Sequence, residues 1–337
     1  MNTNRKWLGL WLLIIVLAVW TYSYYSDNYK DPLPSWNDTP LKEELKDYMV
    51  KVVDSIPVED RIAVFDLDGT LACESPLWFE MLVAVQGLVD QVDQDPSLQE
   101  ETIYEYALKL AENPADTSVT NHWVKNGVNY IDSMILNAFH GMDCEQYVVY
   151  ARSYLDHHKD RKYGQWYRNM FYPPMLELVE WLQKYQFKVY VVSGSMQGVL
   201  WSICPQTLEL DRAHLIGTRQ AQVPVYQEGK QASFVLQNAI FEPKNNNNGK
   251  SLNIYSHIGK IPVIAVGNTT GDFGMFHLAS SSKYPHLSLL INHDDAEREY
   301  AYPPYHGTAV PAWRDSLRIN KWLKADMSKE FKVMWKK

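Results

Sequence analysis

The sequence has 337 residues, 46% of them apolar, and a formal net charge of −8. This length is enough for one large domain or two modest domains plus a tail, and the composition is typical of a globular protein. The negative charge argues against non-specific nucleic-acid binding, which requires a basic surface. The three cysteines, Cys73, Cys144 and Cys204, lack metal-ligand spacing and are too few for a disulfide scaffold, but one disulfide with one free thiol remains open.

An apolar segment follows two basic residues at the N-terminus. Residues 7–20 are uncharged and almost wholly apolar, and tyrosines extend the segment. As a helix, Trp7 to Tyr24 would span about 27 Å, which matches a bilayer core. The basic flank predicts that the N-terminus stays inside while the body is translocated. We expect residues 1–25 to be an uncleaved signal anchor that holds an exported body at the membrane. Secretion after signal-peptide cleavage is the alternative, although no clear cleavage site follows.

Residues 26–55 predict a linker and a leading helix. The first part, residues 26–39, is polar and contains prolines, which is typical of a linker. Residues 41–55 have helical spacing of apolar positions, with charges on one face.

Two carboxylates follow the first predicted buried strand, Ile62 to Phe65. This apolar run ends at once in Asp66, Leu67 and Asp68, and Gly69 comes next. Burying an unpaired carboxylate is very costly, so we expect a cation nearby. Ligands bind at the carboxyl ends of strands in open α/β sheets, and a glycine lets the backbone turn close to a ligand.

Residues 61–74, RIAVFDLDGTLACE, resemble motif I of the haloacid dehalogenase-like (HAD) hydrolases, which is DxDGT after an apolar strand. The resemblance implies that Asp66 is a nucleophile and Asp68 a general acid and base. A carboxylate can attack phosphorus and form an acyl phosphate. A second carboxyl group can protonate the leaving alkoxide and later activate water. Taken alone, the motif is also compatible with an ordinary turn after a strand.

Residues 72–170 show mostly helical periodicity, and we find no convincing strand in them. An all-helical insert at this place resembles the cap domain of phosphoserine-phosphatase-like HAD enzymes, which excludes water and selects the substrate. Glu74 lies near the position of a substrate-binding glutamate in those phosphatases, one residue closer to the motif. An equally supported interpretation is a carboxylate at a helix N-terminus.

A second predicted strand, Phe187 to Val192, ends in Ser193, Gly194 and Ser195. This arrangement resembles HAD motif II. A serine hydroxyl and the following N–H groups can hold a phosphoryl oxygen without adding charge, so Ser193 and Gly194 are candidate phosphate contacts. A helix that starts at Met196 would add its dipole. The alternative is that Ser193 only caps that helix.

A third strand is predicted at residues 213–218, with a hairpin around residues 223–234. Further along, Lys250 follows a glycine and begins a helical segment, which resembles HAD motif III. The lysine there offsets the negative charge of carboxylates and phosphate. Lys244 is the competing candidate for this role.

A fourth predicted strand, residues 261–266, ends in GNTTGD, residues 267–272. This segment resembles HAD motif IV, a strand followed by GDxxxD. Mg²⁺ prefers oxygen ligands, and Asp272 is of the right type. Asn268 departs from the usual aspartate, and its amide oxygen would ligate with one negative charge less. The resemblance implies a Mg²⁺ site formed by the Asp66 carboxylate, the Asp68 carbonyl, Asn268 and Asp272.

The fifth predicted strand, residues 287–292, is followed directly by His293, Asp294 and Asp295. The segment resembles one found in a bacterial branch of the phosphoserine-phosphatase-like enzymes. It could support the motif IV loop or place His293 on the substrate, or it could be only a capping cluster before a helix. For residues 307–337 we expect a C-terminal helix that covers the sheet.

The predicted fold is α/β, with an inserted cap and a preceding transmembrane helix. The core comprises residues 56–71 and 171–337 around a Rossmann-like parallel sheet, for which the resemblance implies the strand order 5-4-1-2-3. The predicted function is Mg²⁺-dependent hydrolysis of a small phosphomonoester through an aspartyl-phosphate. Asp68 favours phosphate transfer, because related dehalogenases and P-type ATPases lack an aspartate there. The alternatives are a phosphotransferase or phosphomutase, and a non-catalytic membrane-anchored binding protein, which only Asn268 supports.

Overall fold

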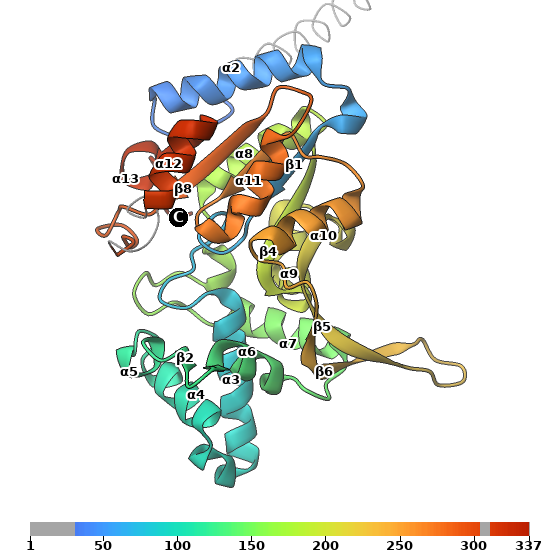
Figure 1. Cartoon of the computed structure of the whole chain (residues 1–337). Coiled ribbons are helices and arrows are strands. Elements are labelled where there is room, and N and C mark those ends of the chain that lie inside the picture. The colour runs from blue at the N-terminus through green and yellow to red at the C-terminus, as the bar shows by residue number, and fades with distance from the viewer. Residues whose placement is uncertain (1–30, 304–310, 337) are drawn as a thin grey trace, which may run out of the picture.

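A seven-stranded sheet forms the centre of the protein, as a computed structural model that describes residues 31–303 and 311–336 shows (Figure 1). The strand order is β6-β5-β4-β1-β7-β8-β9, and every neighbouring pair is parallel except β5 and β6. The strands are β1 (Ile62–Phe65), β4 (Lys188–Met196), β5 (Leu215–Val225), β6 (Ser233–Phe241), β7 (Ile264–Gly267), β8 (Leu287–Asn292) and β9 (Leu323–Asp326).

The five predicted strands are β1, β4, β5, β7 and β8, and they lie side by side as β8-β7-β1-β4-β5. This is the predicted order 5-4-1-2-3. The central strand β1 is buried at all four positions and pairs with β4 and β7. A strand that is covered on both faces reads as a continuous apolar run, which is the pattern of IAVF.

Helices cover both faces of the sheet. On one face, Val64 of β1 packs in a cluster with residues of α10 and α11. On the other, Ala63 and Phe65 belong to a larger cluster that includes residues of α2, α8 and α9, as expected when side chains alternate along a strand. The helices around the sheet are α2 (Pro40–Ser55), α8 (Pro173–Lys184), α9 (Gln197–Leu208), α10 (Asn248–Ile258), α11 (Phe273–Ser280), α12 (Pro311–Asn320) and α13 (Met327–Glu330).

The segment between β1 and α8 is mostly helical and lies at the end of the molecule away from α2 (Figure 1). Its helices are α3 (Phe79–Gln94), α4 (Thr102–Glu112), α5 (Thr117–Thr120), α6 (Tyr130–Ala138) and α7 (Cys144–His157). The expectation that it is all-helical was wrong, because β2 (Val124–Lys125) and β3 (Val128–Asn129) form a short antiparallel hairpin. Asn126 and Gly127 form its turn with φ of 54° and 79°, the conformation that Asn-Gly favours in tight hairpins.

The C-terminal segment is more than the predicted helix. After α12 the chain adds β9, which pairs in parallel with β8 at the edge of the sheet, and then α13. The four residues of β9, LKAD, contain no apolar run, because an edge strand is only partly covered. At the other edge, β5 and β6 form the predicted hairpin and project from the molecule (Figure 1).

Part of the predicted linker is packed against the core. Leu33 and Trp36 are fully buried. The Trp36 Nε1–H donates a hydrogen bond to the Pro174 carbonyl over 2.8 Å, and the indole makes an edge contact with Phe331 at 5.2 Å between ring centroids. The polar, proline-rich composition predicted a linker, and this prediction was wrong for these residues. The two buried apolar side chains fix the segment against the core. The leading helix was predicted correctly and is α2.

Within residues 31–303 and 311–336, none of the helices has the length and apolar character needed to cross a bilayer. The predicted span at residues 7–24 lies outside the described residues. All three cysteines are free and buried, so the disulfide left open by the sequence does not form.

Candidate active site

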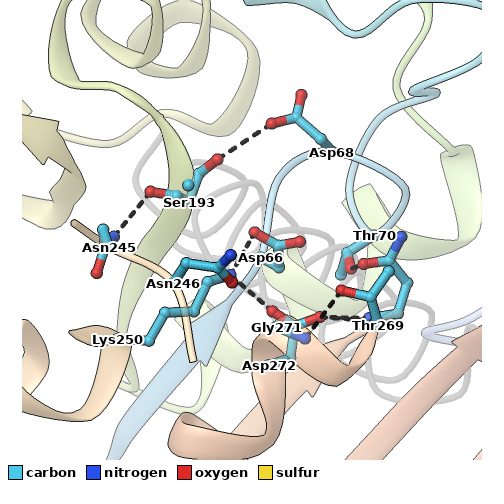
Figure 2. A network of polar contacts seen from close by, with 12 residues as sticks. Asp66, Asp68, Thr70, Ser193, Asn245, Asn246, Lys250, Thr269, Gly271 and Asp272 are labelled. Atoms are coloured by element: carbon cyan, nitrogen blue, oxygen red, sulfur yellow. Dashed lines mark hydrogen bonds and ion pairs between the residues drawn. The ribbon is translucent and has the colours of Figure 1, made fainter. Parts of the chain in front are cut away.

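Asp66 lies at the carboxyl end of β1 and is held by a lysine from another element. Lys250, in the first turn of α10, places its Nζ 2.6 Å from Asp66 Oδ1 and 2.6 Å from Asp272 Oδ1 (Figure 2). All three side chains are buried. The structure thus brings together residues that are up to 206 positions apart in the sequence, at the edge where parallel strands end.

Two carboxylates share this single ammonium group. Burial raises the pKa of Asp66 well above its ordinary value, and the nearby Asp272 adds to the rise while Lys250 opposes it. Burial lowers the pKa of Lys250, but the two carboxylates outweigh burial and hold the pKa above its ordinary value. The group carries one excess negative charge when all three are ionised, and a bound cation would offset it.

Asp272 also closes the turn after β7. Its Oδ2 accepts hydrogen bonds from the backbone N–H groups of Asn268 and Thr269, each over 2.9 Å. A Cβ atom at Gly267 would lie 2.5 Å from the Asp272 carboxyl carbon, so the turn needs glycine there. Because both oxygens have protein partners, the structure gives Asp272 a role in holding Lys250 and this turn. Its predicted place among the metal ligands stays a prediction.

Asp68 faces the opposite side of the site from Asp272 (Figure 2). Its Oδ2 accepts hydrogen bonds from the hydroxyls of Ser195 (2.7 Å) and Ser193 (3.1 Å). Its Oδ1 is buried and has no hydrogen-bond partner among the described residues. Burial raises the pKa of Asp68 to about 6, against the two serine hydrogen bonds. A carboxyl group with this pKa is suited to giving and taking a proton near neutral pH.

Ser193 is buried in the second half of β4. Its Oγ accepts from the Ser195 N–H over 3.1 Å and donates to Asp68. The Asn245 side chain donates to the Ser193 carbonyl over 2.8 Å (Figure 2). It also donates to the Ile216 carbonyl over 2.7 Å, so it links the second half of β4 to the start of β5. The sequence singled out Ser193 of this Ser-Gly-Ser turn, whereas the structure shows that Ser195 makes the shorter contact with Asp68.

A cavity of about 240 Å³ opens over these residues. Its wall from the mostly helical segment includes Trp78, Glu80, Ile131 and Ile135. Ser193 does not line this cavity but contacts it through its hydrogen bond to Asp68. The other predicted site residues all line it: Asp66, Asp68, Glu74, Gly194, Lys250, Asn268 and Asp272.

Lys244, the competing candidate for the motif III lysine, has a different partner. Its Nζ lies 2.5 Å from Oδ1 of Asp132, which is in α6. The pair is partly exposed and joins the helical segment to the loop before α10. Lys250, and not Lys244, therefore reaches Asp66.

Glu80 is a buried cavity residue that the sequence did not indicate. Its Oε1 accepts a hydrogen bond from the Met196 N–H over 2.7 Å, so α3 contacts the last residue of β4. Burial raises the pKa of Glu80 to about 7. No sequence signal marked it, because a glutamate in the first turn of an amphipathic helix usually faces water and stabilises the helix dipole.

His293 is buried behind the motif I loop. Its Nε2–H donates to the Gly69 carbonyl over 2.7 Å, and its Nδ1 lies 2.8 Å from Glu299 Oε2. Burial lowers the pKa of His293, but the Glu299 carboxylate outweighs burial and holds it above its ordinary value. Among the interpretations offered, a loop support is the one the structure favours, although the loop is that of motif I and not motif IV. Asp295 does cap the next turn, accepting from the Arg298 N–H over 3.0 Å.

The predicted metal ligands form an oxygen-only set of two aspartates and one asparagine amide, with a main-chain carbonyl. Among the described residues there is no group of three or more His, Cys, Asp or Glu side chains arranged to hold a metal ion. An all-oxygen set with few carboxylates is compatible with Mg²⁺, which keeps several waters and takes further ligands from phosphate. The excess negative charge around Lys250 and the unpartnered Asp68 Oδ1 also fit a site that receives a cation and a substrate.

A family model for haloacid dehalogenase-like hydrolases matches residues 63–277, which is more than half of the chain. No curated protein matches the sequence. The structure is similar to a conserved protein of unknown function from Anaerococcus prevotii DSM 20548, with 11% identity, a TM-score of 0.53, and coverage of 90% of this chain and 98% of the other. It is also similar to a protein of unknown function from Bordetella pertussis Tohama I, with 13% identity, a TM-score of 0.48, and coverage of 79% and 98%. A phosphoserine phosphohydrolase-like protein from Francisella tularensis matches with 11% identity, a TM-score of 0.41, and coverage of 80% and 97%.

Proposed function

Because the chain belongs to the haloacid dehalogenase-like hydrolase family, we propose that it is a Mg²⁺-dependent phosphatase that hydrolyses a small phosphomonoester through an aspartyl-phosphate. The observation that carries the proposal is the pair of aspartates after β1. Asp66 is held by Lys250 at 2.6 Å, and Asp68 has a pKa near 6 and a buried oxygen without a partner among the described residues. This arrangement supports Asp66 as the nucleophile and Asp68 as the acid and base.

In the first step, the Asp66 carboxylate forms a bond to phosphorus and the bond from phosphorus to the leaving oxygen breaks. The protonated Asp68 carboxyl group gives its proton to that oxygen, so the product leaves as a neutral alcohol. In the second step, the Asp68 carboxylate takes a proton from water, and the water oxygen displaces Asp66 from phosphorus. Phosphate leaves, and both carboxyl groups return to their starting states.

Other residues stabilise charge and position the phosphoryl group. Lys250 holds Asp66 and offsets negative charge at the transferring group. Ser193 and Ser195 fix the Asp68 carboxyl group, and Gly194 lines the cavity close to the start of α9, where a helix N-terminus favours anions. Bound Mg²⁺ would be held by oxygens of Asp66, Asp68, Asn268 and Asp272, and it would neutralise charge on the phosphoryl oxygens.

The cavity of about 240 Å³ favours a small leaving group. Its aromatic and aliphatic wall would contact that leaving group while the phosphoryl group lies at Asp66. The net charge of −8 supports a small phosphorylated substrate over nucleic acid as the partner.

The first test is the Asp66→Asn variant, assayed with an aryl phosphate with and without Mg²⁺. We expect turnover to be lost, since an amide cannot form the acyl phosphate, whereas the thermal unfolding midpoint should change little. Asp68→Asn should lower turnover of an alkyl phosphate by about 10²–10⁴, because general acid catalysis contributes that much. Unchanged turnover by Asp66→Asn would refute the assignment.

The same assay separates the two alternatives. A phosphotransferase would place phosphate on an added alcohol instead of water. A non-catalytic binding protein would show no turnover across a panel of phosphomonoesters and no Mg²⁺ binding in calorimetry.

A further inference from the structure

Four side chains form a hydrogen-bonded group beside the predicted metal site, and we call them the Glu74 cluster: Glu74, Asn268, Tyr300 and Tyr302. A single oxygen, Glu74 Oε1, accepts from the hydroxyls of Tyr300 (2.9 Å) and Tyr302 (2.8 Å) and from Asn268 Nδ2 (3.2 Å). Asn268 Nδ2 also donates to the Tyr302 hydroxyl over 2.5 Å. The four residues come from the segments after β1, β7 and β8, so tertiary folding alone assembles them.

These contacts fix which way the Asn268 amide points. Glu74 Oε1 already accepts from two tyrosine hydroxyls, so the Asn268 atom that faces it is the nitrogen, which can donate. The amide oxygen then points away from the cluster, and Thr70 Oγ1 lies 3.4 Å from it. That oxygen is the atom of Asn268 that could bind a cation.

The packing under the cluster leaves little freedom. A Cβ atom added at Gly69 would lie 1.8 Å from Asn268 Nδ2 and 2.6 Å from Glu74 Oε1, and Gly69 has φ of +74°. The contact between Glu74 and Asn268 therefore passes directly over the Gly69 backbone. His293 holds that backbone from behind through the Gly69 carbonyl, so both sides of the contact are supported.

We propose that Glu74 and Tyr302 are positioning residues that turn the Asn268 carbonyl oxygen toward the cation site, an inference that rests on the proposed function. The cluster also accounts for asparagine at this position, where the family motif has aspartate. An aspartate at residue 268 would set two carboxylates about 3 Å apart, whereas an amide donates to Glu74 and still presents an oxygen on its other side. Glu74 thus acts on the metal site through Asn268, whereas its predicted contact with the substrate stays a prediction.

The test is a double-mutant cycle in the full-length protein, with the Mg²⁺ dissociation constant measured by calorimetry in the absence of phosphate. We expect Asn268→Asp to bind Mg²⁺ about tenfold more weakly, despite its added negative charge. A tenfold loss is at the lower end of what disturbing the partners of a metal ligand costs in metal affinity. Combining it with Glu74→Gln should restore most of the affinity, because the glutamine amide can donate to the introduced carboxylate. This recovery is a coupling that independent sites would not show.

The control for the cycle is Glu80→Gln in the Asn268→Asp background. Glu80 is another buried carboxylate of the same cavity, but its hydrogen bonds go to Met196 and Trp78. It should give no recovery. A second comparison remains informative if Asn268→Asp does not fold. Tyr302→Phe should weaken Mg²⁺ binding more than Tyr300→Phe, because Tyr302 contacts both Glu74 and Asn268, whereas Tyr300 contacts Glu74.

The outcomes separate this inference from the proposed function. Suppose that the wild-type protein binds Mg²⁺ and hydrolyses phosphomonoesters. If Asn268→Asp then binds Mg²⁺ more tightly, or if the effects of the two substitutions are additive, the positioning role is overturned and the phosphatase stands. If the wild-type protein neither binds Mg²⁺ nor turns over substrate, both are overturned.

Discussion

Glu80 shows how a single residue can link the folding energy of the protein to pH. It is buried and its pKa is raised to about 7 from the usual 4.5, chiefly by burial. Among the charged groups around it, Asp68 adds to the rise and Lys244 opposes it. The folded state therefore holds the proton more strongly than the unfolded state, and a shift of this size corresponds to about 3 kcal/mol.

The sign of this linkage gives a prediction. The contribution of Glu80 to stability is fully present below pH 4.5 and is lost as the pH rises to about 7, because the unfolded chain releases its proton first. Between about pH 5 and pH 8 the wild type should lose about 2–3 kcal/mol more unfolding free energy than Glu80→Gln, whose side chain does not titrate. Urea unfolding of both proteins at the two pH values measures this difference. Parallel pH profiles would show that Glu80 is ionised in the folded protein.

At the level of elements, helices α7 and α9 join the helical segment to the core through a close contact. A Cβ atom added at Gly198 of α9 would lie 2.4 Å from Tyr147 Cε1 of α7. Both residues are buried. The backbone of Gly198 is helical, a conformation that any residue could adopt. The need for glycine therefore comes from the close packing and not from the backbone conformation.

We therefore expect Gly198→Ala to lower the unfolding free energy by about 1–3 kcal/mol, because overpacking forces the helices apart. The effect should reverse in a Tyr147→Ala background. There the space is free, and alanine should stabilise α9 by up to about 1 kcal/mol through its higher helix propensity. Denaturant unfolding of the four proteins measures both steps, and a loss of stability in both backgrounds would contradict the contact.

At the level of the whole molecule, the apolar N-terminal segment leads to a prediction about where the protein is located. We propose that residues 7–24 cross the membrane once and leave the body outside the cytoplasm; the basic flank and the apolar length of the segment support this. The full chain should remain in the membrane pellet after alkaline carbonate extraction, since a transmembrane helix is inserted almost irreversibly. A chain that lacks residues 1–25 should be released. Full-length protein in the soluble fraction, or a mature N-terminus beyond residue 25, would contradict the anchor.

The local pattern of the chain was sufficient to predict the central strands, and the resemblance to the HAD hydrolases implied their order. The runs IAVF and LSLLIN match β1 and β8 residue for residue, because strands that are buried on both faces must be apolar throughout. The sequence did not predict short, partly exposed elements such as β9 and the β2–β3 hairpin. Few of their side chains are buried, so their pattern of apolar residues is weak. Trp36 was misjudged for a related reason: its partner Phe331 is 295 positions away in the chain.

By itself, the sequence determined that carboxylates and serines would collect at one edge of a parallel sheet, since each group follows an apolar run and strand ends meet there. The lysine was expected there from the resemblance to motif III. Only the tertiary structure decided which atoms face each other. In the structure, Lys250 pairs with Asp66 and Asp272, and Lys244 pairs with Asp132. Glu80 accepts a hydrogen bond from Met196, and two tyrosines contact Glu74 beside Asn268. The physical reason is that a motif fixes residue types through local backbone chemistry, whereas the partner of a buried polar group is set by which distant segment must satisfy its hydrogen bonds.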